Sequence, residues 1–372
     1  MLLTTIGEAF EINPQVRIPK GTEVPFVTMD QVVPGQRNVS AAENRVFKGG
    51  SKFEHGDTLM ARITPCLENK KIAQYLPPNH ASPSAGSTEF IVIRGKNGVS
   101  ITPFAYYFVQ SPDIHELAIS LMTGTSGRQR VDTEAFRMSE IWLPNLTIQE
   151  KIVKVLGSLD DKIAVNNRII ETADCLVDAL YHQVKKLPPN STFGEEFEIY
   201  GGTTPSTKND EFWGGDIFWA TPTDITALNG PWLLNTSRTI THSGLKATSS
   251  ILHPENAILM TSRATIGKTA LASTPITTNQ GFIVIHAPKD LVPWLFSQLR
   301  NRTHEFESWA NGATFLELPR GVFKTLPFIR CDKDQLAKFN ATAWPLLKHI
   351  EATQQENQTL ARTRDELLPL LM

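Results

Sequence analysis

Two long stretches of the chain repeat apolar residues at spacings of three and four, which is the spacing of one face of an α-helix. Each stretch extends over about forty residues, so each helix would be roughly 60 Å long at about 1.5 Å per residue. The first stripe comprises Ile148, Ile152, Val155, Leu159, Ile163, Asn166, Ile170, Ala173, Val177, Leu180, Val184 and Leu187. The second comprises Leu336, Phe339, Ala343, Leu346, Ile350, Thr353, Asn357, Leu360, Arg364, Leu367 and Leu371. Pro345 is expected to bend or restart the second helix.

The regions before and between these stretches show short apolar runs separated by clusters of Gly, Pro, Asn, Ser and Thr. Residues 88–94 and 281–286 are typical of buried strands. Helices are expected over residues 104–109 and 294–300, because each follows a proline and proline is favourable at the start of a helix. Both regions are therefore predicted to be mixed α/β domains.

The two halves of the chain repeat each other with a period of about 190 residues. Phe90-Ile91-Val92-Ile93 returns unchanged as Phe282-Ile283-Val284-Ile285, and Leu59-Met60 with Arg62 returns as Leu259-Met260 with Arg263. Such a long period describes a domain plus a helix. We predict an α+β chain with an internal pseudo-twofold repeat. Its parts are two mixed α/β domains, residues 1–145 and 189–330, separated by two long antiparallel coiled-coil helices, residues 146–188 and 331–372.

Asn166 and Asn357 lie near the middle of the two predicted helices. If the helices pack antiparallel, these repeat-equivalent asparagines meet, and a buried asparagine pair fixes the register of a helix pair. The alternative is two solvated asparagines on slightly rotated helices. Charged residues outside the stripe are either docking contacts or solvated side chains: Lys151, Lys154, Asp160, Asp161, Lys162 and Arg168.

Composition excludes several classes of protein. The three cysteines are widely spaced and lack metal-ligand spacing, which argues against disulfides and zinc. No run of 18 or more apolar residues occurs, and the first residues do not form a signal peptide, so we expect a soluble cytoplasmic chain without a membrane partner. The 36 basic and 38 acidic residues give a net charge of -2, so any nucleic-acid contact must be local or shared with partners.

Several motifs, in order and partly duplicated, resemble the specificity subunits of Type I restriction-modification systems. They are Leu143-Pro144, Gln149-Glu150-Lys151-Ile152-Val153, Leu159-Asp160-Asp161-Lys162-Ile163, Asn167-Arg168-Ile169, Thr261-Ser262-Arg263, Gly267-Lys268, Thr278-Asn279-Gln280-Gly281-Phe282, Glu356-Asn357 and Arg364-Asp365-Glu366-Leu367-Leu368-Pro369. The resemblance covers the whole chain, although the Thr261 to Lys268 segment is matched only in the second half.

The resemblance implies that each domain is a target recognition domain that reads one half of a bipartite, asymmetric sequence in double-stranded DNA. It also implies that the helices act as a spacer and as the docking site for two methyltransferase (modification) subunits, and that restriction (nuclease) subunits join the complex. Methylation and cleavage would then belong to the partner chains.

Loops rich in base-reading and phosphate-binding side chains agree with this implication. The candidates in the first half are Arg62, Lys70, Lys71, Thr125, Ser126, Arg128, Gln129 and Arg130. Those in the second half are Thr204, Lys208, Arg263, Lys268, Asn279, Gln280 and Arg320. The alternative interpretation of each is an ordinary solvated loop, and Trp213, Trp219 and Trp232 are interpreted as core rather than as a base-stacking surface.

Enzyme signals are weak. Residues 262–269 differ from a phosphate-binding loop by a serine in place of the first glycine, and the first half has no equivalent Gly-Lys-Thr. The histidines show no metal-hydrolase spacing, so we expect no catalytic residue, no metal site and no cofactor. Two other functions stay open. One is a protein-binding scaffold of the same architecture, for which the near-neutral charge argues, and the other is a nucleotide-dependent enzyme.

Overall fold

The computed structural model describes residues 1–80, 83–125, 127–312 and 316–372. The chain forms two compact units, Met1–Ala164 with Gln358–Met372, and Val165–Asn357. Within the described ranges, no helix combines the length and the apolar character that a membrane crossing requires.

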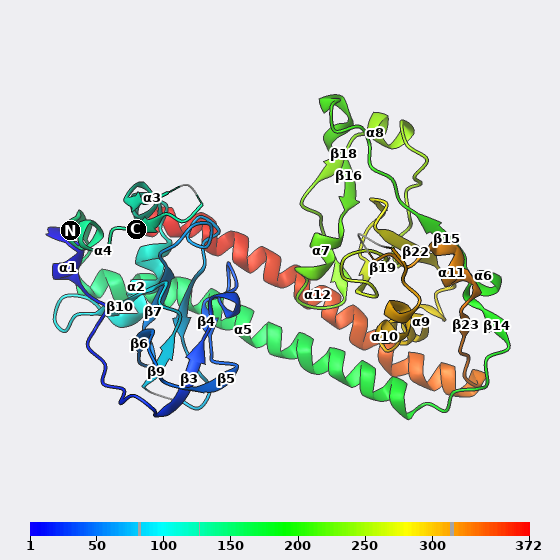
Figure 1. Ribbon diagram of the computed structural model, residues 1–372, viewed down its shortest axis with the longest axis horizontal. Helices are drawn as coiled ribbons and strands as arrows, with labels where there is room; N and C mark the ends of the chain where they lie inside the picture. Colours follow the sequence, from blue (N-terminus) through cyan, green and yellow to red (C-terminus); the bar gives the residue numbers. More distant parts are fainter. Residues whose placement is uncertain (81–82, 126, 313–315) are drawn as a thin grey trace. The chain divides into compact units, whose positions relative to one another are not determined.

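The first unit is built on two sheets and a layer of helices (Figure 1). One sheet has the order β2-β10-β7-β8-β4, with bounds Phe10–Ile12, Phe90–Gly95, Thr58–Ala61, Ile72–Tyr75 and Asn38–Val39. The other has the order β5-β3-β9-β6, with bounds Glu43–Val46, Glu23–Val27, Ser84–Gly86 and Ser51–Phe53. The remaining elements are β1 (Leu2–Thr5) paired with β13 (Glu140–Leu143), β11 (Met122–Thr123) paired with β12 (Arg130–Val131), α1 (Ile6–Ala9), η1 (Met29–Gln31), α2 (Thr102–Gln110), α3 (Pro112–Ser120) and α4 (Thr133–Met138).

The second unit repeats the strand order of the main sheet. Its main sheet has the order β15-β22-β19-β20-β17, with bounds Glu198–Gly201, Phe282–His286, Ile258–Thr261, Thr269–Ala272 and Trp232–Leu233. A smaller sheet has the order β18-β16-β21, with bounds Thr239–Ile240, Trp213–Ala220 and Ile276–Thr278. The other elements are β14 (Ser191–Thr192) paired with β23 (Pro327–Phe328), α6 (Phe193–Glu196), η2 (Asp210–Phe212), α7 (Pro222–Thr226), α8 (His242–Lys246), α9 (Val292–Arg300), α10 (Thr303–Ser308) and α11 (Arg320–Thr325).

Strand register aligns the two halves residue by residue and corrects one sequence match. Ala61 lies opposite Phe90, and Thr261 lies opposite Phe282, so Ala61 and Thr261 are equivalent. Arg62 is therefore equivalent to Ser262 and not to Arg263. The predicted helices after Pro103 and Pro293 are confirmed as α2 and α9, and the predicted strands are confirmed as β10 and β22.

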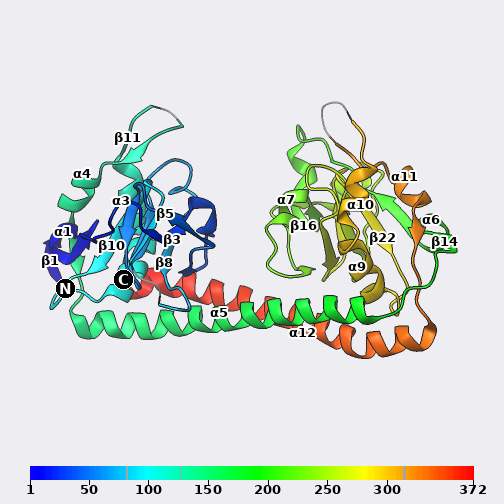
Figure 2. The same cartoon turned by 60° about the horizontal axis from the view of Figure 1, so that its bottom comes forward.

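The two predicted long helices are confirmed as α5 (Leu146–Gln183) and α12 (Lys333–Leu371). In the second unit they run antiparallel, because Asn166 contacts Asn357 while Lys185, just beyond the end of α5, contacts Gln335. Both views show the orange first part of α12 beside the second part of α5 (Figures 1 and 2). In the first unit the order is also antiparallel, because Asp160 contacts Arg364 while Leu368 packs in the same core as Ile152.

Two positions of the first predicted stripe are wrong. Ile148 and Val155 are exposed, because α5 turns Gln149, Ile152 and Leu156 toward the core instead. The buried Gln149 amide donates to the carbonyls of Val99 and Pro144 and accepts from the Ile101 N–H, so its polar atoms are satisfied.

The helix ends are also different from the prediction. Val184 and Leu187 lie beyond the end of α5 at Gln183, and Leu187 is exposed. The second helix does not restart at Pro345, because α12 is continuous through that residue. Ala343 and Leu347 on either side of the exposed proline are fully buried, so core packing holds the helix together there.

A buried histidine in the second unit makes its stability sensitive to acid. The His253 Nδ1 lies 3.0 Å from the His286 Nε2, and His253 is fully buried. Burial first, and the nearby His286 second, lower the pKa of His253 from 6.5 to about 4. The unfolded chain therefore binds a proton more readily than the folded chain, and stability is lost as the pH falls from 6.5 toward 4.

We expect this histidine to cost the second unit about 3 kcal/mol of unfolding free energy between pH 7 and pH 4. Urea unfolding at a series of pH values measures the loss. His253→Gln should flatten the dependence in this window. An equally steep dependence in the variant would show that another group is responsible.

Candidate nucleic-acid interface

In the first unit, the candidates Thr125, Arg128, Gln129 and Arg130 belong to the β11–β12 hairpin. Thr123 on β11 pairs with Arg130 on β12. Gly124 and Gly127 have φ of +121° and +79°, values that glycine adopts readily. Figure 2 shows β11 at the far end of the first unit from α5. Thr125 and Arg128 are exposed at the tip of the hairpin, whereas Ser126 lies outside the described residues.

The base of the hairpin is held by Glu89. Arg130 binds the Glu89 carboxylate through Nε and Nη2 at 3.0 and 2.8 Å, and Arg62 Nε lies 3.9 Å from the same group. The hydrogen bonds from Arg130 are the largest cause that lowers the pKa of Glu89. Gln129 contributes its backbone carbonyl to the Thr64 N–H at 3.0 Å. Arg130 and Gln129 therefore shape the hairpin, and Arg128 is left as its exposed cation.

The two candidate lysines of the first unit, Lys70 and Lys71, have different environments in the structure. Lys71 is half-buried and donates to the Met29 carbonyl at 2.9 Å, so it ties two loops together. Lys70 is exposed and its φ of 52° places it at a tight turn.

Sequence reasoning missed two cations near Arg62. Arg17 and Lys52 line a cavity of about 450 Å³ with Arg62. Arg17 is exposed, Lys52 is half-buried, and the Arg62 Nε is buried without a hydrogen-bond partner among the described residues. Arg17 and Lys52 are 35 residues apart, so they form no recognisable sequence motif. The folded chain brings both of them to one cavity.

In the second unit, residues 203–208 form a loop held from several sides. The Thr203 N–H donates to the Thr278 carbonyl at 3.0 Å, and the Thr204 hydroxyl donates to the Gln280 side-chain oxygen at 2.6 Å. A Cβ at Gly202 would lie 2.1 Å from the Thr278 carbonyl, so this close approach requires glycine. The structure thus brings Thr204 and Gln280 together, with the exposed Lys208 on the same loop.

Two other candidates of this unit, Asn279 and Arg320, contact the backbone of their own domain. The Asn279 side-chain oxygen accepts from the Gly281 N–H at 2.8 Å and closes a turn. Arg320 is exposed, and its guanidinium lies against Gly201, where a Cβ would approach Arg320 Nη1 to 2.8 Å.

Residues 262–269 do not form a phosphate-binding loop. The N–H of Gly267 donates to the Thr261 carbonyl, and the N–H of Lys268 donates to the Thr261 hydroxyl, so these donors are already used. Strand β20 follows, whereas a phosphate-binding loop opens a helix. Lys268 is exposed, and Arg263 forms an ion pair with Glu317 at 3.0 Å.

The helices carry two buried polar clusters. Asn166 Nδ2 donates to Asn357 Oδ1 at 2.8 Å, and Asn357 Nδ2 donates to Asn167 Oδ1 at 2.8 Å. In the first unit, Arg364 binds Asp160 at 2.7 Å, and both side chains are nearly inaccessible. Asp160 is therefore neither a docking contact nor a solvated charge, which corrects both interpretations of this residue.

The predicted aromatic core is confirmed for Trp219 and Trp232, which are 3% and 0% exposed, while Trp213 is half-buried. Trp213 and Trp219 form an edge-to-face pair with ring centres 5.0 Å apart, whereas Trp232 belongs to a separate core cluster.

Comparisons with known proteins identify both halves. The family described as Type I restriction modification DNA specificity domain matches residues 65–173 and again residues 190–329. The MjaIX Type I specificity subunit of Methanocaldococcus jannaschii is 35% identical over 174 residues, which is 46% of this chain and 40% of that protein. The EcoAI specificity subunit of Escherichia coli is 30% identical over 155 residues, which is 40% of this chain and 26% of that protein. The matched region thus spans less than half of the length of these relatives.

A solved structure agrees with the fold. The crystal structure of a Type I restriction-modification S subunit from M. genitalium aligns over 100% of this chain and 96% of that one, with a TM-score of 0.56 and 15% identity. Because the family matches both halves over most of the chain, this chain belongs to the Type I restriction-modification DNA specificity family.

Proposed function

We propose that the chain is the DNA sequence-recognition subunit of a Type I restriction-modification complex. The observation that carries this proposal is the double match to the specificity domain, on two halves that repeat one strand order. Residues 1–145 and 189–330 act as the two target recognition domains. Each reads one half of a bipartite, asymmetric sequence in double-stranded DNA.

The differences between the two domains support two different half-sites. Strand pairing makes Arg130 in the first unit equivalent to Glu317 in the second, because Ile63 bridges to Arg130 and Arg263 bridges to Glu317. Arg130 pairs with Glu89, and Glu317 pairs with Arg263, so the two equivalent positions carry opposite charges and the two candidate surfaces differ in charge pattern.

The helical segments, residues 146–188 and 331–372, serve as the spacer and as the docking site for two methyltransferase subunits, and restriction subunits complete the complex. Catalysis resides in those partners. The free cysteines Cys66, Cys175 and Cys331 suit a reducing cytoplasm.

The asparagine pair sets the helix register in this proposal. Asn166 is 1% exposed, and a register shift would leave its amide buried without Asn357. A buried unsatisfied amide costs about 1–3 kcal/mol, so the paired register is favoured over its neighbours.

Duplex binding at several salt concentrations tests the proposal against a protein-binding scaffold. The chain, assembled with its methyltransferase subunit, is expected to bind duplex DNA with an affinity that falls steeply with salt. A stable complex without salt-dependent duplex binding would favour the scaffold.

Glu89 offers a sharper test of the first domain. Glu89→Gln removes a negative charge and releases Arg62 and Arg130 from their shared carboxylate. We expect non-specific duplex affinity at low salt to rise severalfold and the salt dependence to steepen by up to about one phosphate equivalent. Fluorescence anisotropy measures both quantities.

The control is Glu140→Gln, which neutralises an exposed glutamate on β13. Equal changes in the two variants would remove Glu89 and its arginines from the DNA-facing surface.

A further inference from the structure

Arg238 in the second unit presents a free guanidinium on an aromatic support. Its guanidinium carbon lies 3.5 Å from the centre of the Trp213 ring and 5.5 Å from that of Trp219. The side chain is exposed, and within the described ranges its guanidinium makes no ion pair and no hydrogen bond besides these ring contacts. Stacking on an indole restricts the guanidinium while leaving the N–H donors at its edge available.

The aromatic support is itself fixed to the loop at residues 203–208. Trp213 Nε1 donates to the Ser206 carbonyl at 3.1 Å, and Trp219 Nε1 donates to the Thr203 carbonyl at 3.1 Å. The two indoles pack edge to face with an interplanar angle of 87°. The indoles under Arg238 therefore cannot shift without breaking their hydrogen bonds to this loop.

The backbone around Arg238 is held as well. The Arg238 carbonyl accepts from the Trp219 N–H at 3.2 Å and from the Thr236 hydroxyl at 2.6 Å. The neighbouring Ser237 N–H donates to the Asp224 carboxylate at 2.9 Å. Main chain and guanidinium are thus both positioned before any ligand arrives, which lowers the entropy cost of binding.

Arg238 is also connected to two earlier candidates, Thr204 and Gln280, through side-chain contacts. It is joined through Trp213 to the loop that carries Thr204, and Thr204 binds Gln280. Strand β16, which carries Trp213 and Trp219, pairs with β21 directly before Asn279 and Gln280. Figure 1 shows β16 and β18 extending toward α8 beyond the main sheet of this unit.

We propose that Arg238 is a specificity-determining contact of the second recognition domain, and that it reads the O6 and N7 edge of a guanine in the major groove. The inference rests on the proposed function. A planar fork with fixed orientation matches the two adjacent acceptors of guanine. A phosphate can accept the same fork, but a phosphate contact carries no sequence preference, so the base preference at one position decides between the two ligands.

The test selects bound duplexes from a library in which both half-sites are randomised, using the chain assembled with its methyltransferase subunit. Wild type, Arg238→Ala and Arg238→Lys are compared. Wild type should select a motif with guanine at one position of one half-site. Both variants should lose roughly ten-fold to hundred-fold of the preference at that position and keep the other half-site.

Two further variants keep the result interpretable. Trp213→Phe retains a smaller stacking surface and should weaken the same preference by a lesser factor. Lys289→Ala is the matched control, because Lys289 also lies over an indole, Trp344, at 5.9 Å. Lys289 follows the last residue of β22, whereas Gln280 precedes the first residue of this strand. Replacing Lys289 should therefore leave the selected motif unchanged. Melting temperatures report whether each variant is folded.

The outcomes separate the inference from the proposed function. If wild type selects no motif, the proposed function fails and the role of Arg238 fails with it. If wild type selects a motif and both Arg238 variants select the same one, only the Arg238 inference is overturned. If the Arg238 variants weaken binding to all sequences equally and keep the motif, Arg238 contacts a phosphate and the base-reading inference is overturned.

Discussion

Replacing Arg364 by methionine is expected to lower the unfolding free energy of the first unit by about 3–5 kcal/mol. The side chains of Arg364 and Asp160 are 8% and 2% exposed, and their closest atoms are 2.7 Å apart. Tyr107 donates to the other Asp160 oxygen at 2.7 Å, and burial first, then Asp160, raise the pKa of Tyr107 so that it stays a donor. Without Arg364, the carboxylate is left buried without its cation.

Urea unfolding, with hydrogen exchange reporting on the first unit, measures the loss. The double variant Asp160→Leu/Arg364→Met removes both charges and should recover most of the stability, because replacing a whole buried pair by apolar residues is often neutral. A single variant as stable as the wild type would show that Asp160 is solvated in solution.

Trp232→Ala is expected to cost the second unit about 3–5 kcal/mol, the usual range for truncating a buried aromatic residue. Trp232 is 0% exposed, and its Nε1 donates to the Leu347 carbonyl of α12 at 2.7 Å. Gln354 on the same helix bonds the Trp232 backbone in both directions, at 3.2 and 3.0 Å. This tryptophan therefore attaches the main sheet of the second unit to α12.

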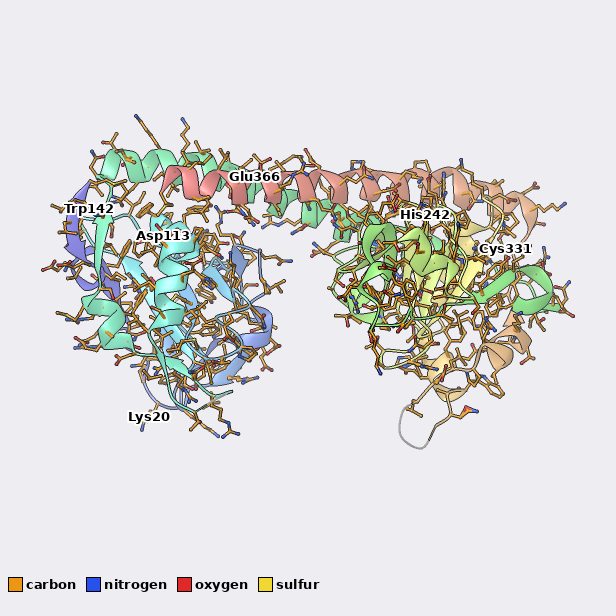
Figure 3. The ribbon with its side chains drawn as sticks, turned by 90° about the horizontal axis from the view of Figure 1, so that it is seen from above. Lys20, Asp113, Trp142, His242, Cys331 and Glu366 are labelled. Atoms are coloured by element: carbon orange, nitrogen blue, oxygen red, sulfur yellow. The ribbon has the colours of Figure 1, made fainter. Side chains whose placement is uncertain are left out.

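The matched control is Trp142→Ala. Trp142 is 63% exposed on β13 and is labelled in Figure 3. Its removal should change the unfolding free energy by less than about 0.5 kcal/mol. Thermal unfolding of both variants provides the comparison, and similar losses would argue that Trp232 packs loosely.

Features with a strong local period could be predicted from the sequence. The two long helices were found because apolar residues recur over about ten turns, and the duplication doubled the signal. The strand at Phe90 and its copy at Phe282 were found for the same reason. The contact between Asn166 and Asn357 followed from their equivalent places in the repeat, since equivalent residues of antiparallel helices meet near the middle.

Contacts that depend on tertiary pairing could not be predicted. Nothing in the sequence near Gln149 indicates that backbone groups from two other segments satisfy its amide. Asp160 has the sequence context of a surface charge, and its partner Arg364 lies 204 residues away. The candidate DNA-binding residues show the same limit. The loop sequence predicts Arg130 as a DNA contact, because Glu89, 41 residues earlier, carries no sign of pairing with it.

Arg238 is the clearest omission among the candidate contacts. In the sequence it is a single arginine between serine and threonine, without a neighbouring cation or motif. Its importance arises only when β18 pairs with β16 and sets the side chain against Trp213. A search for arginines near tryptophan-rich strands would have raised it as a candidate, because such strands provide surfaces for cation–π contacts.

Genome-wide mapping of methylated sites tests the central claim most directly. The chain is co-expressed with its methyltransferase subunit in a host that lacks other methylation, and modified bases are located by single-molecule sequencing. The proposed function predicts a single bipartite, asymmetric motif with a spacer of fixed length. It further predicts that replacing residues 189–330 by the domain of a relative changes one half of the motif. A stable complex that modifies no defined motif would contradict the claim.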